Sequence, residues 1–164
     1  MHVLASSASK KVRVLRFERE PLHGFVQAST FQTPLGIEFL SQDGNLSTIA
    51  YADVKAICFV QGFDDPAPRL DGAYFVSRPK KSGLWVRMRF RDGIQMDGLL
   101  ANQLLQLDPF GYMVTPPDQA INPQWVFVPR AALVDFQVLA VVGSGLKAAK
   151  KFATPKPEAQ AKLF

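Results

Sequence analysis

The stretch Arg13-Val-Leu-Arg-Phe17 recurs later in the chain as Val86-Arg-Met-Arg-Phe90. After each copy come a turn, a glycine, an apolar run, a second glycine and a closing pair of strand-like segments. The two glycines are Gly24 and Gly36 in the first copy and Gly98 and Gly111 in the second. A repeat with a period of about 75 residues predicts two similar structural units in one chain.

Each copy contains five strand-like segments with a helical turn before the last of them. In the first copy the strands are expected at 12–17, 22–28, 36–40, 46–49 and 55–60, and the helical turn at 51–54. In the second copy they are expected at 85–90, 96–101, 111–115, 125–128 and 135–142, and the turn at 129–133. Asp43-Gly44 and Asp92-Gly93 are typical hairpin turns. The pattern predicts an all-β protein made of two tandem five-stranded small barrels of SH3-like or Sm-like type, with flexible termini.

The segments outside the two copies differ from them in composition. Residues 64–83 are rich in proline, glycine and charge, which predicts a linker between a first barrel at 11–63 and a second at 84–143. Residues 1–10 are small and polar and are expected to be disordered. Residues 144–164 are expected to form a basic C-terminal tail.

The positive charge of the chain is concentrated in its tails. The formal net charge is +5, but residues 144–164 hold five lysines and one glutamate, and residues 1–10 add one lysine. The remaining 13 basic and 13 acidic residues balance, so the body from 11 to 143 is formally neutral. A nucleic-acid surface on the folded part would need concentrated positive charge, and the body offers little of it.

Several functional classes have no support in the residues. No apolar run approaches the roughly 20 residues of a membrane-spanning helix, and no secretory signal is recognised at the N-terminus. The single Cys58 is expected to be a buried apolar residue and agrees with a reducing cytoplasm. No phosphate loop, metal-ligand spacing or catalytic constellation is found. We therefore expect a cytoplasmic protein that is not an enzyme, with no catalytic, cofactor-binding or metal-binding residues and no recognised small-molecule site.

One group of side chains could form a contact surface. Arg87 and Arg89 alternate with apolar residues and so share one face of a strand, Arg91 extends the row, and Trp85 lies beside it. Such a row can clamp phosphate or stack on bases, or it can be the solvated side of a strand with carboxylates across from it as partners. Two more aromatic residues at irregular places, Phe110 and Tyr112, are expected to contact the other half or a partner.

The tail is the second candidate binding element. Its lysines, Lys147, Lys150, Lys151 and Lys156, could contact RNA, an anionic membrane surface or an acidic protein. The alternative is a tail that only keeps the protein soluble.

The order of strands, and the run Arg89-Phe-Arg-Asp-Gly93 with Gly98 after it, resemble the SH3-like and Sm-like small barrels. More closely, residues 11–143 resemble an uncharacterised bacterial family of paired small β-barrels. The resemblance implies a fold and no established activity.

From these observations we expect a non-enzymatic binding or assembly module that acts through protein–protein contacts, with a protein partner or self-association, as a subunit of a larger complex. The alternative is binding of RNA or single-stranded nucleic acid through the arginine row and the lysine-rich tail, which would weaken steeply with salt.

Overall fold

The computed structural model describes residues 9–66, 69–117 and 125–143. The predicted basic tail and the first eight residues lie outside this part of the chain. The first strand begins at Ser9, so Ser9 and Lys10, which were expected to be disordered, are paired in the sheet.

The described residues form β-strands and short 3-10 helices, which confirms the prediction of an all-β protein. The first half contains β1 (Ser9–Arg16), β2 (Leu22–Gln27), β3 (Gln32–Thr33), β4 (Gly36–Ser41), β5 (Leu46–Ile49), η1 (Tyr51–Asp53) and β6 (Val54–Phe59). The second half contains β7 (Gly83–Phe90), β8 (Gln95–Leu100), η2 (Leu104–Gln106), β9 (Gly111–Thr115), β10 (Trp125–Pro129), η3 (Arg130–Ala132) and β11 (Leu133–Val142). The short β3 and η2 are the elements that the sequence pattern did not predict.

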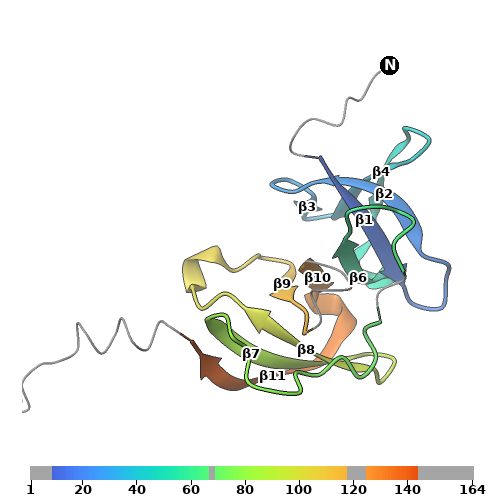
Figure 1. Cartoon of the computed structure of the whole chain (residues 1–164). Helices are drawn as coiled ribbons and strands as arrows, with labels where there is room; N and C mark the ends of the chain where they lie inside the picture. The colour runs from blue at the N-terminus through green and yellow to red at the C-terminus, as the bar shows by residue number, and fades with distance from the viewer. Residues whose placement is uncertain (1–8, 67–68, 118–124, 144–164) are drawn as a thin grey trace, which may run out of the picture.

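The named strands belong to one antiparallel sheet. Its order is β11-β7-β8-β9-β10-β6-β1-β2-β4-β3, and β5 pairs with β4. β6 closes the first half and β10 is the fourth strand of the second half, yet the two lie side by side (Figure 1). The halves are therefore joined by strand pairing.

The two pairing strands β6 and β10 contribute to both hydrophobic cores. Ile57 and Phe127 lie directly opposite each other and belong to the first core, which also contains the first-half residues Val12 and Val14. Cys58 and Val126 are the next opposite pair and belong to the second core. Because successive side chains of a strand point to opposite faces, each of these strands separates the two cores.

The register of the opening strands corrects the alignment of the repeat by one residue. Val12 lies opposite Gly24, and Val86 lies opposite Gly98. Arg13 therefore corresponds to Arg87. Aligning the Arg-Phe endings of the two motifs instead matches Arg13 with Val86. The glycines hold this register because a Cβ on Gly24 would lie 2.5 Å from the ring of Phe39 and one on Gly98 would lie 2.8 Å from the Val114 side chain.

The segment from 69 to 82, inside the predicted linker, packs along the second half. Leu70 is buried in the second core. Ala73 forms a parallel bridge with Met96, and the backbone N–H of Asp97 donates to the Ala73 carbonyl at 2.8 Å. The segment thus adds extended backbone to the part of β8 that β9 does not cover, which places the residues after Ala73 beside the cleft described below.

The described residues contain no helix long and apolar enough to cross a membrane.

Candidate functional site

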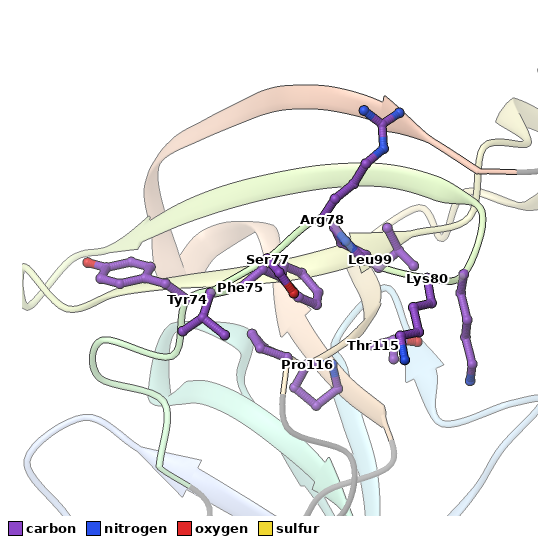
Figure 2. Close-up of a pocket in the computed structure, with 12 residues that line it drawn as sticks. Tyr74, Phe75, Ser77, Arg78, Lys80, Leu99, Thr115 and Pro116 are labelled. Atoms are coloured by element: carbon purple, nitrogen blue, oxygen red, sulfur yellow. The ribbon is translucent and has the colours of Figure 1, made fainter.

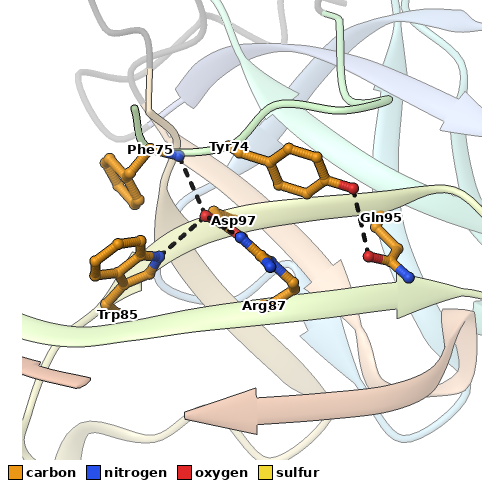
Figure 3. A network of polar contacts seen from close by, with 6 residues as sticks. All are labelled: Tyr74, Phe75, Trp85, Arg87, Gln95 and Asp97. Atoms are coloured by element: carbon orange, nitrogen blue, oxygen red, sulfur yellow. Dashed lines mark hydrogen bonds and ion pairs between the residues drawn. The ribbon is translucent and has the colours of Figure 1, made fainter. Parts of the chain in front are cut away.

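A buried carboxylate organises one side of the second half. Asp97 on β8 is completely buried, and its oxygens accept hydrogen bonds from Arg87 Nε at 2.7 Å and Trp85 Nε1 at 3.0 Å (Figure 3). The backbone N–H of Phe75 donates to the same carboxylate at 3.2 Å. Since a carboxylate is tolerated in the interior only when charge and hydrogen bonds compensate it, these donors explain why an acid stands there. Asp97 also ties the segment after Ala73 to the sheet.

The Arg87 side chain is held by Asp97 and Tyr74. The hydrogen bond from its side chain to Asp97 raises the pKa of Arg87, so its charge is permanent. The guanidinium lies over the Tyr74 ring, 4.5 Å from the centroid, and the Tyr74 hydroxyl donates to Gln95 Oε1 at 3.3 Å. Phe75 meets Trp85 edge to face at 5.7 Å. These contacts fix both aromatic residues and leave Arg87 committed to the protein itself.

The first half contains the same device with a different acceptor. Arg13, the counterpart of Arg87, donates from Nε to His23 Nε2 at 2.9 Å. Its Nη2 donates to the carbonyls of Phe63 at 3.0 Å and Asp65 at 2.9 Å. In both halves, therefore, an arginine of the opening strand bonds a side chain of the next strand, and this pair anchors backbone that follows β6.

Beside the Asp97 network lies a cleft of about 560 Å³. We call it the basic cleft. Its cationic side chains come from one short run, Arg78, Lys80 and Lys81, and none of its described lining residues is acidic. Its apolar lining consists of Phe75, Val76, Pro79, Leu99, Pro116 and Pro117. Figure 2 shows Phe75, Leu99 and Pro116 gathered at the cleft, while Arg78 extends toward β11, where it donates to the Val141 carbonyl at 3.3 Å.

A second hollow of about 420 Å³ continues from the basic cleft along β9. The two hollows share Lys81, Leu99 and Thr115. The second one extends to Tyr112 and to Trp125, whose side chain is 56% exposed. The two hollows therefore adjoin, and the second one also has the acidic Asp108 in its lining.

The predicted arginine row does not form one free surface. Trp85 and Arg87 are engaged by Asp97, so for Arg87 the structure shows the cross-strand carboxylate that the sequence left as an alternative. Arg91 lies over the ring of Phe17 at 4.2 Å and donates to a carbonyl of η1. Arg89 is exposed and lies between Gln95 and Asp135 on the neighbouring strands.

The two predicted aromatic contact residues lie in different surroundings. Phe110 stacks on Tyr51 of the first half, with centroids 5.3 Å apart, so it connects the halves. Tyr112 stacks on Phe136 at 4.3 Å and packs against the second core. The predicted tail lysines, Lys147, Lys150, Lys151 and Lys156, lie outside the described residues.

The basic cleft itself was missed in the sequence because its wall belongs to the predicted linker. Arg78-Pro-Lys-Lys81 was interpreted as linker charge. The available signal was that this run carries three cations and no acid in a body whose basic and acidic residues balance.

A family model described as a family of unknown function, DUF6982, matches residues 8–140, and the chain belongs to this family. No curated protein and no solved structure gives a significant match. The matched span contains both cores and the basic cleft.

Proposed function

We propose that this protein is a non-enzymatic binding and assembly module of the cytoplasm, built as two fused SH3-like or Sm-like small barrels, and that its basic cleft receives an acidic, partly apolar segment of a partner protein. The observation that carries the proposal is the cleft itself, in which Lys80 and Lys81 border an apolar lining with no acidic residue among its described members, while Arg78 extends toward β11.

The tandem arrangement is supported by the order of the strands. The first half runs β6-β1-β2-β4-β5 across the sheet and the second half runs β11-β7-β8-β9-β10. These orders are identical when corresponding strands are compared, and each half supplies most of the residues of one core. Small barrels commonly bind through their loops and open strand edges.

The lining of the cleft indicates the chemistry of its occupant. Lysines at a rim attract carboxylates and raise the rate of association, while apolar side chains in the centre supply most of the binding energy. A peptide with aspartate or glutamate beside leucine or phenylalanine satisfies both. The segment that leads to the lysines is attached to the sheet at Phe75, whose N–H donates to Asp97, and at Arg78, which donates to the Val141 carbonyl, so less of the wall has to be ordered on binding.

The aromatic side chains of the cleft favour a peptide over a nucleic acid. Single-stranded nucleic acids bind by stacking bases on free aromatic faces. Here one face of Tyr74 is covered by Arg87, and Phe75 is packed against Trp85. The nucleic-acid alternative would rest on Arg89, which is not a lining residue of the cleft, and on the lysine-rich tail, which lies outside the described residues.

The proposal is tested with a random peptide library displayed on phage and selected on the full chain. We expect enriched sequences in which acidic and large apolar residues adjoin. Fluorescence anisotropy with an enriched peptide then compares the wild type with the double variant Lys80→Glu/Lys81→Glu, which should bind at least about tenfold more weakly. The control is Lys10→Glu, at an exposed position of β1 away from the cleft.

A 20-nucleotide polyuridine is measured in parallel at about 50 mM salt. Binding of polyuridine that depends on residues 144–164, with no peptide enrichment, would favour the nucleic-acid alternative. Equal peptide affinity in the cleft variant and in the control would show that the cleft is not the site.

A further inference from the structure

The junction between the two halves suggests a contact between copies of the chain. At this junction β6, the last strand of the first half, pairs antiparallel with β10, the fourth strand of the second half. The counterparts of these strands are β11 and β5. Among the described residues β11 pairs only with β7 and β5 only with β4, so one edge of each is open.

The correspondence between the halves is defined residue by residue. In the first half Ile57 of β6 pairs with Val14, and in the second half Phe136 of β11 pairs with Met88 at the corresponding position. Each of these two closing strands also has an irregularity at the same place near its start. Likewise, Ile49 pairs with Ile37 of β4 as Val128 pairs with Tyr112 of β9. From Leu133 to Val138, β11 therefore pairs with β7 as β6 pairs with β1, and a second irregularity of β11 lies beyond this stretch, between Val138 and Ala140. β5 pairs with β4 as β10 pairs with β9.

We propose that copies of this chain associate head to tail, with β11 of one copy pairing antiparallel with β5 of the next, in the register that β6 and β10 use inside the chain. The internal pair Trp125–Phe59 then becomes Leu46–Val138 between copies. Leu46 is 72% exposed and Val138 is 53% exposed, so this pairing would remove apolar surface of both side chains from water.

The side chains also predict that this contact is weaker than the internal junction. The internal pair Val126–Cys58 is completely buried. Its counterpart between copies is Ser47–Gln137, which is polar and can form hydrogen bonds across the strands but adds little apolar burial. We therefore expect association that is reversible and depends on protein concentration.

A contact between two different surfaces leaves a free edge at each end of the assembly. It generates a ring if the rotation between copies closes and an open chain if it does not. The same property gives a decisive test, because a copy that is blocked at one edge can still use the other.

The test uses Leu46→Lys and Val138→Lys, which place a charge on opposite edges. Sedimentation velocity over a concentration series should show oligomers of the wild type and about tenfold weaker association, or monomers, for each variant alone. An equimolar mixture of the two variants should form dimers and nothing larger, since one intact pair of edges remains. The control Val76→Lys changes a fully exposed residue of the basic cleft and should associate like the wild type.

A cross-link provides a second measurement that does not depend on lysine being tolerated. Leu46→Cys and Val138→Cys should form a disulfide-linked dimer when mixed under oxidation, while Cys58 is buried and does not interfere. A wild type that stays monomeric at every concentration, or a variant mixture that stays monomeric without cross-linking, would overturn the proposal. Peptide binding at the basic cleft is measured on the monomeric variants, so the two proposals fail independently.

Discussion

Arg87 and Asp97 form a cross-strand ion pair in which Arg87 Nε lies 2.7 Å from an oxygen of a completely buried carboxylate. The pair lies at the position that corresponds to Arg13 and His23 in the first half, but its acceptor is a carboxylate and not an imidazole. The carboxylate accepts four hydrogen bonds from three residues, and its removal would detach the Phe75 backbone beside the basic cleft from the sheet.

We expect Asp97→Ala to lower the free energy of unfolding by about 3 kcal/mol, because a buried acceptor of four hydrogen bonds is lost. Asp97→Asn keeps one acceptor oxygen and the size of the side chain, so it should cost less. Urea denaturation measures both values, and the affinity for the selected peptide should fall with them. If Asp97→Ala left the free energy of unfolding unchanged, the network would not support the fold.

Cys58 should be inert in the native protein. Burial raises the pKa of its thiol to about 12, and the positive charge of Arg13 offsets only part of this effect. Because the thiolate is the reactive form, a disulfide reagent at pH 8 should label the native chain only as fast as it unfolds. In urea the labelling should be complete within the mixing time of the assay. Rapid labelling without denaturant would contradict the buried position.

The same raised pKa predicts how alkaline pH affects stability. The unfolded thiol loses its proton near pH 9, whereas the native thiol keeps its proton until the pH approaches 12. The stabilisation that Cys58 contributes to the fold is therefore fully present below the unfolded pKa and declines as the pH rises toward the native pKa. Denaturation at pH 7 and pH 10 should show this decline in the wild type. Its Cys58→Ala variant should show a smaller one.

The ion pair between Lys55 and Asp92 connects the two halves and should respond to acid. Its atoms are 2.6 Å apart. Partial burial opposes ionisation of Asp92, but hydrogen bonds from Lys55 and from the Ile94 N–H outweigh it, so the pKa of Asp92 lies below its usual value. The stabilisation is therefore present above the unfolded pKa and is lost as pH falls through the lower native pKa. Asp92→Asn should lower the free energy of unfolding by less than about 1 kcal/mol at pH 7, because Asp92 is partly exposed to water. The loss should be smaller still in high salt, which screens the pair.

Gly98 is required by the packing of its neighbour. A Cβ there would lie 2.8 Å from the Val114 side chain, so Gly98→Ala should lower the free energy of unfolding by about 1–3 kcal/mol. The nearest atom is the Val114 Cβ, which alanine would keep, so the obstacle is removed only by Val114→Gly. That change should reduce the cost of Gly98→Ala, and a double-mutant cycle with Val114→Gly should show coupling that favours the double variant. At Gly24 the obstacle includes the Leu40 carbonyl, which no side-chain change removes. Additive effects at Gly98 and Val114 would refute the steric explanation.

Much of the fold could be predicted from the sequence because its signals are local. Alternation, Asp-Gly turns and an unbroken alignment of 49–54 with 128–133 placed the strands and the turns before β6 and β11. The register was not predictable from the Arg-Phe motif, since the packing around Gly24 and Gly98 determines it. β3 has two residues, too few for a periodic pattern.

The candidate site was less predictable because it depends on contacts between distant segments. The alternation of Arg87 and Arg89 was interpreted correctly as one face of a strand, but the partner Asp97 is identified only by the pairing of β7 with β8. The sequence also contains a signal for the pairing of the two halves, which the prediction did not use. Ala56-Ile-Cys58 and Val126-Phe-Val128 are apolar at every position, as strands buried on both faces are.

The adjacent residues Ile57 and Cys58 belong to different cores. When β6 opens, water therefore reaches both interiors in the same event, and neither half retains a complete interior when the other melts. Unfolding should follow a single transition despite the repeat. If the chain arose by duplication, its two copies have since lost their thermodynamic independence, so a mutation in one half changes the stability of the other.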